Sequence, residues 1–225
     1  MSGPIITLFT HRCCDEDAHL RYPELRRRLI PHGIDLVCDP FGPGDQVVAR
    51  IKTISFESLL FLLTPKSWAS VYCQAELSAA RHRSAPVFFL RLRGEVPEEC
   101  KPWLVLDMSS PLGDQQLIEL AGAVQKRVSF RRLILSITKA VQPDDALDAA
   151  KSLFDTSDAT VIEEGSADLE KLYRESTSPT LRYWIVATLA KAPTPTSQGL
   201  LRRLQKIEDH PLPANAILES ISAQA

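Results

Sequence analysis

Short apolar segments alternate with amphipathic stretches through the first half of this 225-residue sequence, and this alternation restricts its fold most. The pattern predicts a parallel sheet whose strands are connected and covered by helices. The run 59–63 is apolar without alternation, as in a central strand buried on both faces, and Pro65 ends it. We predict an α/β fold with five strands, at 5–9, 34–38, 59–64, 87–92 and 104–106, and helices near 17–32, 46–55, 70–82 and 114–127.

From about residue 129 the strand pattern stops, and apolar residues recur every three or four positions, which predicts helices. We place them at 133–141, 144–154, 168–174, 180–192, 197–207 and 214–221. Prolines that can begin a helix lie at or near these boundaries, at Pro143, Pro179, Pro193, Pro195, Pro211 and Pro213. The helix at 180–190 and its successor resemble a HEAT-like pair, and the helix at 214–221 is left without a partner.

The predicted organisation is an α/β domain at 1–128 followed by an α-helical, HEAT-like domain at 129–225. Two helical pairs are fewer than a stable solenoid normally has. We therefore expect these helices to dock on the first domain or on another copy of the chain, and to control assembly.

Composition excludes several classes of protein. A net charge of -2 supplies no broad basic surface for nucleic acid, and apolar runs such as 59–63 are too short to span a bilayer. The first residues lack the charged start and apolar stretch of a signal peptide, so a cytoplasmic location is expected. Five cysteines without CxxC spacing predict reduced thiols and neither a disulfide framework nor a zinc site.

Glu76 stands out because it places a carboxylate on a helix face that should be apolar. At about 100° per residue, this face also carries Tyr72, Cys73, Leu77, Ala79 and Ala80. The opposite face carries Gln74, Ser78, Arg81 and His82. Burying an unpaired carboxylate is costly. Glu76 is therefore either an ion-pair member, with Arg12 or His11 as candidate partners, or a group held in a cleft for chemistry.

Three loops, at 10–17, 39–45 and 65–70, follow predicted strands at the edge where open α/β sheets usually bind ligands. The first strand ends in Leu8-Phe9-Thr10-His11, the second is followed by the glycine- and proline-bearing segment 39–44, and the third by the stretch 64–77. In this order the segments resemble a Toll/interleukin-1 receptor (TIR) domain. They match its first box, with Thr for Ser and His for Tyr, its BB loop, and its aromatic-Cys-x-x-Glu-Leu stretch. Pro102-Trp103 resembles a late aromatic box, and the resemblance spans about residues 4–127.

The TIR resemblance implies a flavodoxin-like sheet and, in the NAD+-cleaving branch of the family, a catalytic glutamate at the position of Glu76. It also implies activation by self-association through the TIR domain and, in bacteria, antiphage defence. NAD+ is then the substrate, with ADP-ribose or a cyclic ADP-ribose isomer as product. It is not a bound cofactor, since the sequence has no GxGxxG or Walker motif.

Two alternatives to simple NAD+ hydrolysis stay open. One is a non-enzymatic TIR adaptor, or a mimic of host signalling, that recruits protein partners through its BB loop and helical domain. The other is a base-exchange or cyclising enzyme that uses the same site.

Cleavage of the nicotinamide–ribose bond fits a single carboxylate. Nicotinamide needs no general acid to leave, and a carboxylate can stabilise the oxocarbenium-like ribose. The predicted substrate-binding residues around Glu76 are Phe9, Thr10, His11, Arg12, Asp39, Phe41, Trp68 and Tyr72. Aromatic rings can stack on nicotinamide, and Arg12 can pair with a phosphate. The structural alternatives are packing for Trp68 and Tyr72, a surface charge for Arg12, and a loop cap for Asp39.

Metal and cysteine chemistry are less favoured by the spacing. His11 with Cys13 and Cys14 crowds three soft groups onto four residues, unlike a normal ligand set, so no metal site is predicted. A nucleophilic role for Cys73 lacks a histidine on the same helical face.

Overall fold

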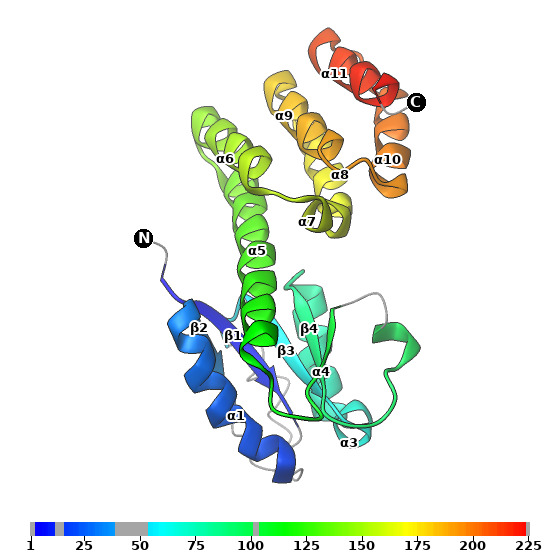
Figure 1. Ribbon diagram of the computed structural model, residues 1–225. Helices are drawn as coiled ribbons and strands as arrows, with labels where there is room; N and C mark the ends of the chain where they lie inside the picture. The colour runs from blue at the N-terminus through cyan, green and yellow to red at the C-terminus, as the bar shows by residue number, and fades with distance from the viewer. Residues whose placement is uncertain (1–2, 12–15, 39–53, 101–103, 224–225) are drawn as a thin grey trace. The chain divides into compact units, whose positions relative to one another are not determined.

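The computed structural model (Figure 1) describes residues 3–11, 16–38, 54–100 and 104–223. The chain forms two compact units, Met1–Val128 and Ser129–Ala225. Within the described residues, no helix has the length and apolar character needed to cross a membrane.

The first unit is an α/β structure built on five parallel strands, as predicted. They are β1 (Ile5–Thr10), β2 (Ile34–Val37), β3 (Ser58–Leu63), β4 (Val87–Arg91) and β5 (Val105–Asp107). Their order in the sheet is β2-β1-β3-β4-β5. The chain thus adds β2 on one side of β1 and then places β3, β4 and β5 in succession on the other side. Every residue of β3 is buried, as its unbroken apolar sequence indicated.

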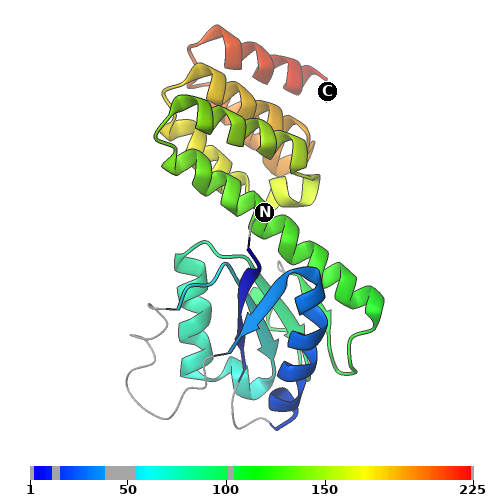
Figure 2. The ribbon, with the colours of Figure 1, turned by 90° about the vertical axis from the view of Figure 1, so that its left-hand side faces the viewer.

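Helices cover both faces of the sheet (Figure 2). On one face, α1 (Glu16–Leu29) and the first half of α5 (Asp114–Lys139) pack on Phe9, Leu60 and Phe88. On the other face, α4 (Val71–His82) packs on Leu8, Phe61 and Phe89. We call these the α1 face and the α4 face. Because successive side chains of a strand point to opposite faces, neighbouring residues of β1 belong to different layers.

Short helical turns complete this unit. The turn η1 (Ile30–His32) ends at Gly33, whose positive φ of 73° is the left-handed conformation that favours glycine, and Gly33 O then accepts from Ile5 N at 2.8 Å. The other turns are α3 (Pro65–Trp68) and η2 (Glu98–Cys100). The segment 65–70, expected to be a loop, is therefore largely helical. The predicted helix at 46–55 falls mostly outside the described residues.

The predicted break between helices at 114–127 and 133–141 is wrong, because α5 is continuous from Asp114 to Lys139. No proline or glycine interrupts the stretch between them, and Val128 and Phe130 are both buried. The boundary between the two units therefore falls inside a helix and not in a linker.

The second unit continues with six further helices among the described residues. They are α6 (Pro143–Thr156), α7 (Ala159–Glu164), α8 (Ser166–Glu175), α9 (Pro179–Ala190), α10 (Pro195–Gln205) and α11 (Pro211–Ser222). Four of them begin with a proline, as the sequence predicted. The helix α7 was not predicted. In Figure 1, α6, α9 and α11 lie side by side, and α8 and α10 pack behind α9 and α11. The last helix is not unpartnered, since it contacts α9 and α10.

A buried polar network joins three parts of this second unit. The Glu208 side chain, which is 0% exposed, accepts from the Tyr173 hydroxyl and lies 3.3 Å from Arg182 Nη1. Its other oxygen accepts from His210 N at 2.8 Å. Burial, and then the hydrogen bond to Glu208, raise the pKa of Tyr173. The network thus fixes the segment between α10 and α11 against α8 and α9.

Candidate functional site

Glu76 lies on the buried face of α4 and is only 5% exposed. Cys73, Leu77 and Ala80 share this face, which confirms the burial predicted from helical periodicity. The prediction is wrong for Tyr72, which is 50% exposed in the first turn of α4, and Ala79 is only partly buried. The buried residues of α4 follow the spacing i, i+3, i+4 and i+7. The arc that they cover is narrower than the predicted arc, so Tyr72 lies outside the buried face.

A capping box begins α3, the short helix that connects β3 to α4. Thr64 Oγ1 accepts from Ser67 N at 3.0 Å, and Ser67 Oγ accepts from Thr64 N at 2.8 Å. This arrangement turns the chain directly at the carboxyl end of β3. Gln74 Nε2 then donates to Trp68 O at 2.8 Å and ties the end of α3 to α4. The second turn of α4, with Glu76, therefore comes soon after the carboxyl edge of the sheet, the edge at which open α/β sheets usually bind ligands.

Trp68 packs on the α4 face of the sheet. Its ring lies 6.0 Å from Phe61 and 6.4 Å from Phe89 in edge-on arrangements, and it is partly exposed. Trp68 is thus a packing residue that also keeps part of its surface accessible at the end of β3.

Thr10 is a fully buried residue at the carboxyl end of β1, beside Phe61 of β3. Two residues after Leu8, it points to the α4 face. Its Oγ1 is buried and has no hydrogen-bond partner among the residues that the structure describes. An unsatisfied buried hydroxyl is uncommon. Glu76, Thr10 and Trp68 therefore all belong to the α4 face.

Phe9 and His11, two further predicted residues, lie in a different place. Phe9 is 1% exposed in the core of the α1 face, with its ring 5.5 Å from Tyr22 of α1. The His11 ring lies 5.4 Å from Phe9. The predicted site residues are thus divided between two faces, and strand alternation was the signal that separates Phe9 from Thr10.

The sequence did not predict a contact between His11 and Cys38. The sulfur of Cys38, one residue beyond β2, lies 3.5 Å from Nδ1 of His11. Tyr22 OH donates to Leu36 O at 3.0 Å beside this pair, and burial is the largest cause that raises the pKa of Tyr22. Both contact residues follow adjacent strands, so the strand order was the information needed to find them.

Arg12, Asp39 and Phe41, together with the BB-like segment 39–44 and Pro102-Trp103, lie outside the described residues. Cys13 and Cys14, considered with His11 as metal ligands, also lie outside them. In the part of the chain that is described, no group of three His, Cys, Asp or Glu side chains is arranged to hold a metal.

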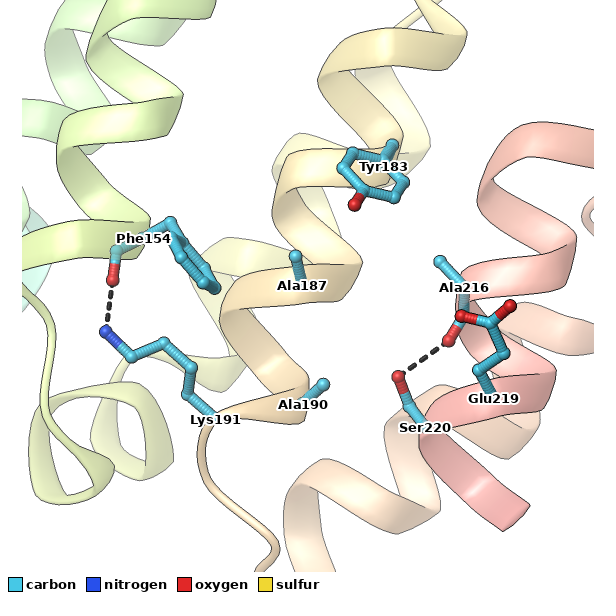
Figure 3. A pocket seen from close by; sticks show the side chains of 8 residues that line it. All are labelled: Phe154, Tyr183, Ala187, Ala190, Lys191, Ala216, Glu219 and Ser220. Atoms are coloured by element: carbon cyan, nitrogen blue, oxygen red, sulfur yellow. Dashed lines mark hydrogen bonds between the residues drawn. The ribbon is translucent and has the colours of Figure 1, made fainter. Parts of the chain in front are cut away.

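The second unit carries an open pocket of about 320 Å³ on its α6–α9–α11 layer (Figure 3). Ala187 and Ala190 of α9 form its floor, while Phe154 stands on one side and Tyr183 at one end. The amine of Lys191 donates to Phe154 O and lies 4.8 Å from the Phe154 ring centre. On the other side are three residues of α11, Ala216, Glu219 and Ser220. The pocket thus combines an apolar floor with one cation and one anion.

No known family model matches this sequence, and no curated protein is significantly similar to it.

Proposed function

We propose that the first unit is a TIR-type NAD+ nucleosidase in which Glu76 is the catalytic carboxylate. The observation that carries this proposal is the burial of Glu76, 5% exposed, in the helix that follows the ligand-binding edge of β3. The strand order β2-β1-β3-β4-β5 is the flavodoxin-like order of doubly wound sheets, which suits the TIR resemblance. Thr10 Oγ1, which has no hydrogen-bond partner within the described part of the chain, lies on the same face and is a candidate partner for a substrate hydroxyl.

In the proposed reaction the bond between ribose and nicotinamide breaks, and its electron pair leaves with the nicotinamide nitrogen. Positive charge then develops on the ribose, where the Glu76 carboxylate stabilises it. Because the carboxylate is shielded from water, its field acts with less screening than at the surface. Attack by water gives ADP-ribose, and attack by the substrate's own adenine gives a cyclic isomer. Thr10 and Trp68 would hold the ribose and the base.

The test is nicotinamide release from NAD+ by concentrated full-length protein, with and without a crowding agent. Glu76→Gln should slow release by about 10²- to 10³-fold, the usual cost of removing one preorganised charge. Glu119→Gln, the same change at an exposed site on α5, should leave the rate unchanged. Circular dichroism spectra should show that all three proteins are equally folded.

Two outcomes would reject parts of this proposal. If the wild type releases no nicotinamide under any assembling condition, the enzyme assignment is wrong. If Glu76→Gln is as active as the wild type, another group performs the chemistry.

The second unit is proposed to be a HEAT-like assembly module. Its helices form two layers, and α9 contacts α6, α8, α10 and α11, as expected for stacked helical pairs. Its pocket is a candidate contact site for another copy or a protein partner. Ala187→Arg places a long cation on the pocket floor and should lower the molar mass measured by light scattering. Ala167→Arg, on the exposed surface of α8, should not, and an unchanged mass for Ala187→Arg would reject this use of the pocket.

The second candidate function, a non-enzymatic adaptor, is favoured by exposed apolar side chains at the start of α4. Val71 is 80% exposed and Tyr72 is 50% exposed, which suits a protein-contact surface. An adaptor predicts that Val71→Asp weakens self-association and that no form of the protein cleaves NAD+.

The TIR resemblance alone carries the proposal that the protein acts in bacterial antiphage defence.

A further inference from the structure

A thiol and an imidazole meet at the carboxyl ends of β1 and β2, on the α1 face of the sheet. The two strands pair in parallel with Leu8 opposite Val37, so the residues that follow them leave the sheet side by side. Cys38 Sγ and His11 Nδ1, 27 positions apart in sequence, are 3.5 Å apart. This distance is within reach of a hydrogen bond that involves sulfur. The contact is separate from the Glu76 site, which lies on the α4 face.

An imidazole at this distance can take the thiol proton and leave a thiolate paired with an imidazolium. The thiolate is the reactive form of cysteine, and a neighbouring histidine is one of the groups that favour it. Among the residues that the structure describes, this region also holds Tyr22, whose hydroxyl donates to Leu36 O, and Asp35, which pairs with Arg26 at 3.0 Å. The Tyr22 hydroxyl proton is thus hydrogen-bonded to a backbone carbonyl, and the Asp35 carboxylate is paired with a guanidinium.

Cys38 differs from the other described cysteines in exposure. It is partly exposed, whereas Cys73 is 2% exposed and Cys100 is 0% exposed. Burial, and then the nearby Glu99 charge, raise the pKa of Cys100 to about 11, so this thiol is almost entirely protonated at neutral pH. Cys73 and Cys100 therefore serve as internal comparison thiols, which we expect to react more slowly than Cys38.

We propose that Cys38 is a modification site at which His11 activates the thiol for exchange with small-molecule disulfides. In this step the Cys38 proton moves to His11 Nδ1, and the sulfur attacks one sulfur of the disulfide. A new S–S bond forms as the old one breaks, and the second half of the reagent leaves as a thiolate. The disulfide is the oxidant, and a free thiol reverses the modification by the same exchange.

The experiment uses full-length protein in which Cys13 and Cys14, outside the described residues, are both replaced by Ser. Oxidised glutathione is added between pH 6 and 9.5, and the rate of mass gain is followed by mass spectrometry with peptide mapping. One glutathione should attach at Cys38 before Cys73 or Cys100 reacts. His11→Phe, which keeps a ring against Phe9 but removes Nδ1, should slow this reaction by about tenfold at pH 7, where an unassisted thiol is only a few per cent ionised.

The pH profile separates activation from a change in structure. The rates of His11→Phe and its parent should converge above pH 9, where the thiol ionises without help. Tyr22→Phe, which changes a neighbouring group but not His11, should retain the parent's rate at pH 7. Equal rates for His11→Phe and its parent at every pH, or faster labelling of Cys73 or Cys100, would overturn the proposal. A uniform rate change at every pH would assign His11 to access and not to proton transfer, and would overturn it equally.

Discussion

Gly165, between α7 and α8, is expected to tolerate no side chain. A Cβ at this position would lie 2.3 Å from Cε1 and 2.5 Å from Cζ of Phe130, and 3.1 Å from Val161 O. The Phe130 ring is 7% exposed within the core of the second unit, so it has little room to move. The backbone of Gly165, at φ -91° and ψ 7°, is open to other residues, so any cost comes from this contact.

The size of the effect follows from these distances. Carbon atoms in contact lie about 3.5–4.0 Å apart, so the ring or the chain must shift by roughly 1 Å. Such overpacking costs about 1–3 kcal/mol. Replacing glycine by alanine also reduces the conformational entropy of the unfolded chain, which stabilises the folded state by about 0.4–1 kcal/mol. Gly165→Ala should therefore destabilise the second unit by about 1–2 kcal/mol, which for a domain of roughly 100 residues lowers its melting temperature by about 4–8 °C per kcal/mol.

Gly199 in α10 supplies a matched control in the same unit. The nearest atom to its added Cβ is Arg203 Nη1, at 3.9 Å. Gly199→Ala should therefore stabilise the unit by about 0.5–1 kcal/mol through helix propensity. Scanning calorimetry measures both variants, and hydrogen exchange of peptides from each unit assigns the transition to residues 129–225.

A double variant tests whether Phe130 is the cause of the Gly165 effect. Phe130→Leu shortens the side chain, so Gly165→Ala should cost at least about 1 kcal/mol less in that background than in the wild type. The reasoning is refuted if Gly165→Ala is as stable as the wild type, or if the two substitutions are simply additive.

Two further predictions concern the capping box and the buried tyrosine. Thr64→Ala removes the acceptor for Ser67 N and should destabilise the first unit by about 0.5–2 kcal/mol, measured as a lower urea midpoint. Thr64→Ser keeps the hydroxyl and should retain most of the wild-type stability. Equal losses of stability in the two variants would show that the hydroxyl is not the cause. The pKa of Tyr173 is raised in the folded protein by burial and by Glu208, so its contribution to stability is complete below its unfolded value, about 10, and is lost as pH rises further. Urea midpoints between pH 8 and 11 should therefore fall less steeply for Tyr173→Phe than for the wild type, and parallel curves would contradict this linkage.

Local patterns predicted the secondary structure of the described residues well where one period dominates. The all-apolar segment of β3 and the four helices that begin with proline needed only their own residues. The burial of Glu76 also followed from spacing along a single helix. The errors arose where a local pattern was ambiguous. Tyr72 is apolar enough for the buried face of α4 but lies at the edge of that face. The helix α5 continues through the boundary between the units, where the sequence alone predicted that a helix ends.

The candidate site was predicted less well because it depends on which face of the sheet each residue of β1 occupies. The sequence grouped Phe9, Thr10 and His11 with Glu76 as substrate-binding residues, whereas strand alternation sends Phe9 to the α1 face and Thr10 to the α4 face. The missing step was to assign each residue of β1 to a face before grouping it with Glu76. Strand alternation could have supplied that step.

The sequence by itself determined the five strands, most of the helices and the burial of Glu76 on α4, because these depend on residues a few positions apart. Only the tertiary structure decided which distant groups meet. The approach of Cys38 to His11 requires β1 and β2 to be neighbours, and the contact between Gly165 and Phe130 requires α5 to pack against the α7–α8 junction. Such contacts depend on topology and on the shapes of several side chains at once, and no local period in the sequence encodes them.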